Sequence, residues 1–174
     1  VGSGARNLIT QNSNEPIDLD YNLMIIDSEI SINNCREIKE YIRKLFNVIL
    51  NKNGWSDCMD STSVLTTEKR HFTKGNHTEF SIDLAIVFND RNGWHRLIHE
   101  KTGFTAWDRY YWNLVPDSNL LDKVTDIKGK HLWNEVIDEY REKKNLYLCR
   151  QDYNHPSFNV YVETVNQVFN KYFD

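Results

Sequence analysis

Two runs of alternating side chains carry three aspartates, and they restrict the possible folds of this chain more than any other feature. Residues 17–26 read Ile-Asp-Leu-Asp-Tyr-Asn-Leu-Met-Ile-Ile, and residues 80–88 read Phe-Ser-Ile-Asp-Leu-Ala-Ile-Val-Phe. Side chains alternate between the two faces of a strand, so Asp18 and Asp20 would project from one face, about 7 Å apart. On the other face we expect a core, to which the intervening side chains Leu19, Tyr21 and Leu23 contribute.

The third aspartate, Asp83, lies in the second run between two apolar residues. If the two strands are neighbours in one sheet, Asp83 joins Asp18 and Asp20 on a single face. Clustered carboxylates disfavour one another's ionisation, and a divalent cation is the simplest compensation. Magnesium takes oxygen ligands and keeps positions open for substrate phosphates. The cluster therefore predicts phosphoryl or nucleotidyl transfer, although strand-edge carboxylates that are solvated or paired with lysine remain the alternative.

The rest of the chain predicts both helices and strands. Apolar residues at three- and four-residue spacing predict a helix from about residue 34 to 51. A β-branched run predicts a strand over residues 61–72 that forms an antiparallel hairpin with residues 78–88, and a shorter strand follows at 94–100. Residues 101–117 are aromatic and read as irregular, and three helices follow them.

This order of elements predicts the α+β class, with a mixed sheet covered by helices and a helical C-terminal part. We expect a catalytic core over residues 1–115 and a helical region over residues 116–174 that packs on it. The chain begins at Val1 rather than at a methionine, which predicts that upstream residues are missing.

Composition narrows the partners and the compartment. The formal net charge of −4 gives no general attraction to nucleic acid, so long nucleic acids are not favoured as partners. The three cysteines, Cys35, Cys58 and Cys149, form no CxxC pair and predict reduced thiols in a cytoplasmic protein. No apolar run approaches the roughly 18 residues that a membrane span needs.

Three motifs together resemble the DNA polymerase beta-like nucleotidyltransferase superfamily. They are Gly2-Ser3 at the start of a short predicted helix, Asp18-Leu-Asp20 on a strand, and Asp83 on a later strand. The resemblance covers about residues 1–100 and implies a palm-like nucleotidyltransferase sheet. It also implies transfer of a nucleoside monophosphate from a nucleoside triphosphate, such as ATP, to a hydroxyl acceptor, with release of pyrophosphate. The acceptor could be a nucleotide, a small molecule, a protein or an RNA end.

The resemblance assigns metal-binding roles to the three aspartates. Asp18 and Asp20 would bind two ions, Mg²⁺ or Mn²⁺, and Asp83 would bind the ion that activates the acceptor hydroxyl. Two ions in such a site stabilise both the entering and the leaving oxygen.

The same resemblance assigns phosphate binding to Gly2 and Ser3, and Arg6 lies one turn further on. Backbone amides at a helix start form an anion site, which agrees with this role. A Gly-Ser turn at the first residues is also what an expression tag leaves behind, and Arg6 could be a solvated helix arginine.

Other interpretations remain open at this stage. The chain could be a non-catalytic domain of the same fold that binds a nucleotide or a protein, or another metal-dependent enzyme such as a nuclease or phosphohydrolase. His95 and His99 have a four-residue gap that separates them along a strand, so we expect structural or surface histidines rather than a zinc site. The aromatic residues at 107–112 could stack on a base, but packing between sheet and helices is favoured.

Overall fold

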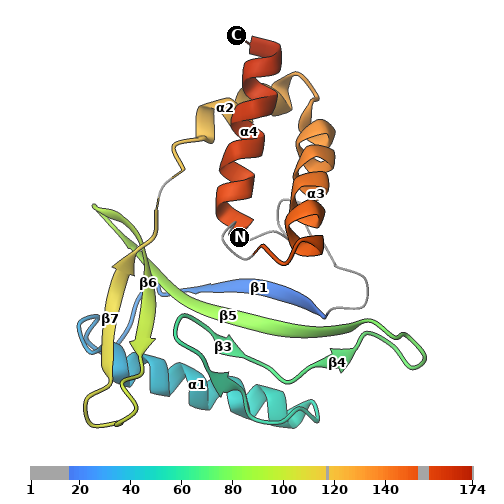
Figure 1. The fold of residues 1–174 in the computed structure, drawn as a ribbon. Helices are drawn as coiled ribbons and strands as arrows, with labels where there is room; N and C mark the ends of the chain where they lie inside the picture. The colour runs from blue at the N-terminus through green and yellow to red at the C-terminus, as the bar shows by residue number, and fades with distance from the viewer. Residues whose placement is uncertain (1–15, 117, 153–156, 174) are drawn as a thin grey trace. The chain divides into compact units, whose positions relative to one another are not determined.

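The computed structural model describes residues 16–116, 118–152 and 157–173. These residues form two compact units that divide after Val115 (Figure 1). We call residues 16–115 the sheet unit and the described residues from Pro116 onward the helical unit, and we describe each by itself. The short helix predicted within the first ten residues lies outside the described residues.

The sheet unit contains a seven-stranded sheet built around β5 (Glu79–Asp90). β1 pairs with β5 in parallel, and β3, β4 and β6 pair with β5 antiparallel. β2 extends the sheet from β3, and β7 extends it from β6. The other six strands are β1 (Ile17–Met24), β2 (Met59–Asp60), β3 (Leu65–Thr66), β4 (Arg70–His71), β6 (Gly93–Glu100) and β7 (Arg109–Leu114). The mixed sheet and the α+β class are therefore confirmed.

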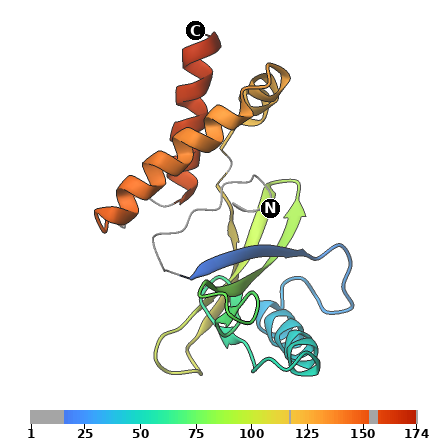
Figure 2. The same ribbon diagram turned by 90° about the vertical axis from the view of Figure 1, so that its right-hand side faces the viewer.

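One helix, α1 (Cys35–Lys52), covers one face of this sheet (Figure 1, Figure 2). Ile38 and Leu50 on α1 are buried, because their spacing keeps them on the side that faces the strands. They pack in one core with Leu65, Ile86 and Leu97 from three strands. Full burial of one such side chain contributes about 1.5–3 kcal/mol, so this apolar face holds α1 to the sheet.

Three sequence expectations about the sheet differ from the structure. Residues 109–114 form strand β7 instead of an irregular segment, and Trp112 of this strand packs against the core and donates its indole N–H to the Ile32 carbonyl at 2.7 Å. Tyr21 and Leu23 of β1 are 54% and 40% exposed, because the buried core lies under β3, β5 and β6 rather than under β1. The expected strand over residues 61–72 is also divided, into β3 and β4, yet both pieces pair antiparallel with β5 as predicted.

The helical unit has a separate core. Its helices are α2 (Leu121–Gly129), α3 (Trp133–Cys149) and α4 (Ser157–Phe173), which confirms the three helices expected there. Ile127, Val136, Val160 and Val165 are completely buried between them. Lys143 and Glu163 form an ion pair of 2.8 Å between α3 and α4. Within the described parts of the chain, no helix combines the length and the apolar character that crossing a membrane requires.

Candidate carboxylate site

The parallel pairing of β1 with β5 brings the three predicted aspartates together. Asp20 lies directly opposite Asp83, and Asp18 lies opposite Ser81. Neighbouring strands are about 4.8 Å apart, and residues opposite each other project from the same face of a sheet. The expectation that the two acidic strands are neighbours is therefore confirmed.

The aspartates occupy the face of the sheet that α1 does not cover. Leu84 and Ile86 alternate with Asp83 along β5, and Ile86 packs in the core beneath α1. Asp83 must therefore point to the opposite side of the sheet. Asp18 and Asp20 are exposed and Asp83 is half-buried, so the carboxylates are accessible to a ligand from solvent.

Two hydroxyl groups that the sequence analysis did not consider bind two of these carboxylates. Ser81 donates a hydrogen bond to Asp18 Oδ1 at 2.7 Å, and Thr66 donates one to Asp83 Oδ1 at 2.6 Å. Asp20 forms no side-chain hydrogen bond within the described residues. The alternation of β5 could have revealed Ser81, which lies two residues before Asp83, whereas Thr66 depends on the register between β3 and β5.

The ionised form of the Asp20 carboxylate is electrostatically unfavourable in this position. Partial burial against the sheet raises its pKa above the usual value, and the negative charges of Asp83 and Asp18 raise it further. The positive charge of Arg96 acts in the opposite direction. The site therefore disfavours the ionised form of Asp20, as expected where carboxylates crowd together without full compensation.

Arg96 is the cationic side chain that reaches this face, and the sequence analysis missed it. It lies on β6 opposite Val87, which is on the same face of β5 as Asp83. Its Nε is buried and has no hydrogen-bond acceptor among the described residues. Arg96 thus places a positive charge near the carboxylates without using all of its donors.

A buried polar network lies on the other face of the sheet, beneath α1. Lys39 of α1 is 1% exposed and forms an ion pair of 2.7 Å with Asp60. His99 contacts Asp60 through Nδ1 at 2.8 Å and Asp108 through Nε2 at 3.0 Å. His99 is therefore a buried structural residue, and Tyr110 stacks on its ring at 4.1 Å between centroids. Burial alone would raise the pKa of Asp60, but Lys39 and His99 together hold it below its usual value.

The donor types suit a hard divalent cation, although the observed side chains do not form a closed cage. Carboxylate oxygens are the ligands that Mg²⁺ and Mn²⁺ prefer, and Asp20 keeps both of its oxygens free of side-chain donors within the described residues. In the same part of the chain, no group of three or more His, Cys, Asp or Glu side chains is close enough to hold a metal ion. The predicted phosphate-binding residues Gly2, Ser3 and Arg6 lie outside the described residues.

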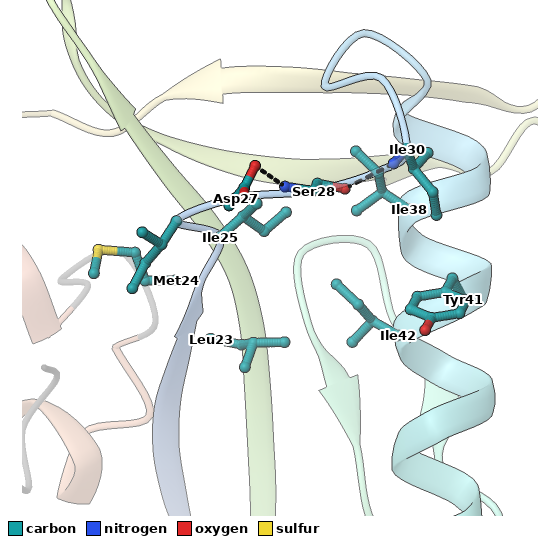
Figure 3. A pocket seen from close by; sticks show the side chains of 10 residues that line it. Leu23, Met24, Ile25, Asp27, Ser28, Ile30, Ile38, Tyr41 and Ile42 are labelled. Atoms are coloured by element: carbon teal, nitrogen blue, oxygen red, sulfur yellow. Dashed lines mark hydrogen bonds between the residues drawn. The ribbon is translucent and has the colours of Figure 1, made fainter.

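The sheet unit also has an apolar groove on the side of α1. Its volume is about 460 Å³, and it lies between the end of β1 and the helix (Figure 3). Leu23, Ile25, Ile38 and Ile42 line it, and its polar groups come from Asp27, Ser28 and the hydroxyl of Tyr41. Asp27 accepts a hydrogen bond from the Ser28 amide at 2.8 Å, so its carboxylate supports the turn that follows β1. The groove is separate from the carboxylate face.

Comparison of the sequence with protein-family models and with curated proteins finds no match.

Proposed function

We propose that this protein is a metal-dependent nucleotidyltransferase that transfers a nucleoside monophosphate from a nucleoside triphosphate to a hydroxyl acceptor. The observation that carries this proposal is the placement of Asp20 opposite Asp83, beside Asp18, on the open face of the sheet. The three carboxylates disfavour one another's ionisation, and the positive charge of Arg96 offsets this only in part, since the pKa of Asp20 stays raised. Perturbed ionisable groups on an accessible face are typical of functional sites.

Asp18, Asp20 and Asp83 would hold the divalent cation, Mg²⁺ or Mn²⁺, and the proposal allows two ions. Such ions supply Lewis-acid stabilisation of the phosphate oxygens as charge develops on them. The chain's own carboxylates supply the negative charge that attracts the cations. Binding would also relieve the repulsion that raises the pKa of Asp20.

In the proposed reaction the acceptor hydroxyl oxygen attacks the α-phosphorus of the nucleoside triphosphate. A bond forms between this oxygen and the α-phosphorus, and the bond from the α-phosphorus to the oxygen that bridges to the β-phosphorus breaks. The electron pair of the broken bond leaves with pyrophosphate. The hydroxyl proton passes to Asp83, directly or through water, and then to solvent. Thr66 occupies one Asp83 oxygen and leaves the other available for this proton.

Two further parts of the proposal concern the fold and the ligands. The order of β1, α1 and β5, with acids on the first and last of these, supports a palm-like nucleotidyltransferase sheet. The acceptor would be a nucleotide, a small molecule, a protein side chain or an RNA end. The net negative charge of the chain makes long nucleic acids the less favoured acceptor.

Thermal unfolding with ATP, GTP, CTP and UTP, each with and without Mg²⁺ or Mn²⁺, tests the proposal. A ligand that binds only the folded chain stabilises it by about 2.7 kcal/mol when present at 100 times its Kd. We expect a metal-dependent rise in Tm with at least one triphosphate, and loss of that rise in Asp20→Asn. The control Asp138→Asn changes an exposed aspartate of α3 and should respond like the wild type.

Turnover is then measured as pyrophosphate release with the triphosphate that gives the shift. Binding without turnover across all four classes of acceptor would instead identify a nucleotide-binding domain without catalytic activity. Hydrolysis of the triphosphate or of a polynucleotide without transfer would identify a phosphohydrolase or nuclease. The absence of any metal-dependent shift would contradict the proposed metal site.

A further inference from the structure

β1 is an edge strand, and its outer side has no partner strand among the described residues. It pairs in parallel with β5 and with no other strand of the described sheet. The Ile25 amide donates to the Val87 carbonyl at 2.9 Å, so the backbone of the odd-numbered residues of β1 is directed toward β5. The backbone groups of the even-numbered residues, which include Asn22 and Met24, therefore point outward. Such an edge is a template for pairing with another extended chain.

The second half of this edge carries none of the residues with which proteins usually protect a free strand. Lysine, proline and other charged side chains discourage pairing at an edge. β1 contains no lysine or proline, and its only charges are those of Asp18 and Asp20. From Tyr21 onward the strand is uncharged, and Tyr21, Leu23 and Met24 are exposed. The second half of β1 is therefore open to pairing.

The side of α1 that is turned toward β1 is apolar and exposed. Tyr41 and Ile42 of α1 lie across the apolar groove from Leu23 of β1 (Figure 3). Leu45 and Ile49 follow on successive turns of the helix, and both are exposed. A strand added at the outer edge of β1, about 4.8 Å further out, would continue the apolar layer along this side of α1.

We propose that a second copy of this chain pairs with the first through β1, antiparallel and across a two-fold axis perpendicular to the sheet. Such an interface uses the same surface of both copies and needs no separate complementary patch. Leu23 and Ile25 line the groove on the α1 side, so the odd-numbered residues Leu19 and Tyr21 project from that face as well. β1 thus offers both halves of the interface, an open backbone edge and a row of apolar side chains. The pairing does not depend on the proposed catalytic activity.

Charge selects the register of this pairing. A pair centred on Asp20 would place two carboxylates directly opposite each other, which is destabilising. A pair centred on Tyr21 would leave the two copies of Asp20 as diagonal neighbours, about 7–8 Å apart. A pair centred on Asn22 puts Asp20 opposite Met24 and separates the two copies of Asp20 by about 13 Å along the strands. The register centred on Asn22 therefore avoids the repulsion.

The same register matches apolar residues on the α1 side. Leu19 lies opposite Ile25 of the second copy, and Tyr21 lies opposite its Leu23, and symmetry repeats both pairs. The outward backbone groups of Asn22 then pair with those of the second Asn22. A register centred on Leu23 would shorten the paired segment from residues 19–25 to residues 21–25. Pairing about Asn22 thus combines the longest apolar match with separated charges.

Cysteine cross-linking of the full chain tests this register. The background is Cys149→Ser, which removes the exposed thiol and leaves Cys35 and Cys58 buried. Asn22→Cys then places two cysteines opposite each other with Cα atoms about 5.5 Å apart, which a disulfide can bridge. The matched control is Asp18→Cys on the same edge, whose two copies would lie about 26 Å apart along the strands. We expect a disulfide-linked dimer from Asn22→Cys and none from Asp18→Cys.

Sedimentation velocity over a range of protein concentrations tests the association itself. We expect a monomer–dimer equilibrium for the wild type. Leu23→Lys places a charge beside the two-fold axis and should raise the dimer Kd about tenfold or more. The control Leu114→Lys makes the same change at an exposed leucine of β7 and should leave the Kd unchanged. Circular dichroism checks that each variant is folded.

Four results would overturn the proposal. One is a wild-type chain that stays monomeric at every concentration, and another is a dimer that Leu23→Lys does not weaken. Equal cross-linking of Asn22→Cys and Asp18→Cys would show random collision instead of a fixed register. Assembly beyond a dimer would show that the edge pairs without a closed two-fold interface.

Discussion

Asp20 and Asp83 lie opposite each other on two parallel neighbouring strands, and their carboxylates share the face of the sheet that carries no helix from the sheet unit. Their mutual repulsion raises the pKa of Asp20 in addition to the effect of burial. The pair therefore links fold stability to pH and to cation concentration, and that link can be measured.

Asp20→Asn should stabilise the metal-free protein at pH 7. A raised folded-state pKa means that the folded chain holds the Asp20 proton more tightly than the unfolded chain does. The resulting stability is fully present below the unfolded pKa of about 3.9 and is lost as pH rises through the folded pKa. At pH 7 the charged side chain is thus destabilising, by at most about 1 kcal/mol because it is exposed and solvent screens it.

Urea unfolding at pH 7 without divalent cations measures this gain, with Asp138→Asn as the exposed control. The difference between wild type and Asp20→Asn should shrink as pH falls below the unfolded pKa of about 3.9, because Asp20 is then neutral in both the folded and the unfolded chain. Added Mg²⁺ should raise the stability of the wild type more than that of Asp20→Asn. A variant less stable than the wild type at pH 7 would show that repulsion does not dominate at Asp20.

Most elements of the sheet unit could be predicted because their signals are local. The alternation in residues 17–26 and 80–88 predicts two strands, and the apolar spacing in residues 34–51 predicts α1. The strand at 109–114 was missed because its aromatic residues do not alternate with polar ones, and its pairing with β6 is a tertiary contact.

Only part of the candidate site could be predicted, because some of its residues are brought there by strand pairing that the local sequence does not reveal. Aspartate is uncommon in strands, so three of them in apolar runs attract notice. Thr66 and Arg96 carry no such signal, since one lies in an ordinary β-branched run and the other in a strand with mixed polarity. Their relevance depends on the register that places them opposite Asp83 and Val87, and register is not readable from either strand alone.

Lys39→Met should destabilise the fold strongly. The substitution removes one partner of a buried ion pair and leaves the Asp60 carboxylate in the interior with the His99 ring as a side-chain partner. Breaking a buried pair in this way costs about 3–5 kcal/mol. The matched control Lys44→Met changes an exposed lysine of the same helix and should alter the free energy of unfolding by less than about 0.5 kcal/mol.

Chemical unfolding of both variants at pH 7 provides the comparison. If Lys39→Met is too unstable to isolate, Asp60→Asn serves as a second variant, because the amide retains hydrogen-bonding capacity but loses the charge. Equal effects of Lys39→Met and Lys44→Met would contradict the importance assigned to the buried network.

Asp108→Asn should make the free energy of unfolding fall less steeply than that of the wild type as the pH is lowered into the acid range. The backbone amide of Thr102 and then the side chain of His99 hold the pKa of Asp108 below its usual value. A lowered folded-state pKa contributes stability that is present above the unfolded pKa of about 3.9 and is lost as pH falls through the folded pKa. Asparagine cannot titrate, so this contribution is absent from the variant.

The measurement is the free energy of unfolding of both proteins between pH 7 and pH 3. Wild type should be the more stable at neutral pH, and its advantage should decrease below about pH 4. A constant difference over the whole range would show that Asp108 acts only through packing or neutral hydrogen bonds.

Arg96→Gln should change the binding of cations and of triphosphates in opposite directions. Arg96 lowers the pKa of Asp20, so its positive charge acts on the same carboxylates that would bind the cation. Removal of that charge makes the site more negative, and Mn²⁺ should bind about two- to fivefold more tightly without nucleotide, the scale of a single exposed charge pair. A triphosphate loses a cationic partner and should bind more weakly, with a smaller dependence of Kd on salt.

Isothermal titration with Mn²⁺ alone and with the triphosphate in excess Mn²⁺ separates the two effects, and Arg91→Gln, in the turn between β5 and β6, is the control. Parallel changes in both affinities would indicate that Arg96 supports the fold of the site instead of its charge balance.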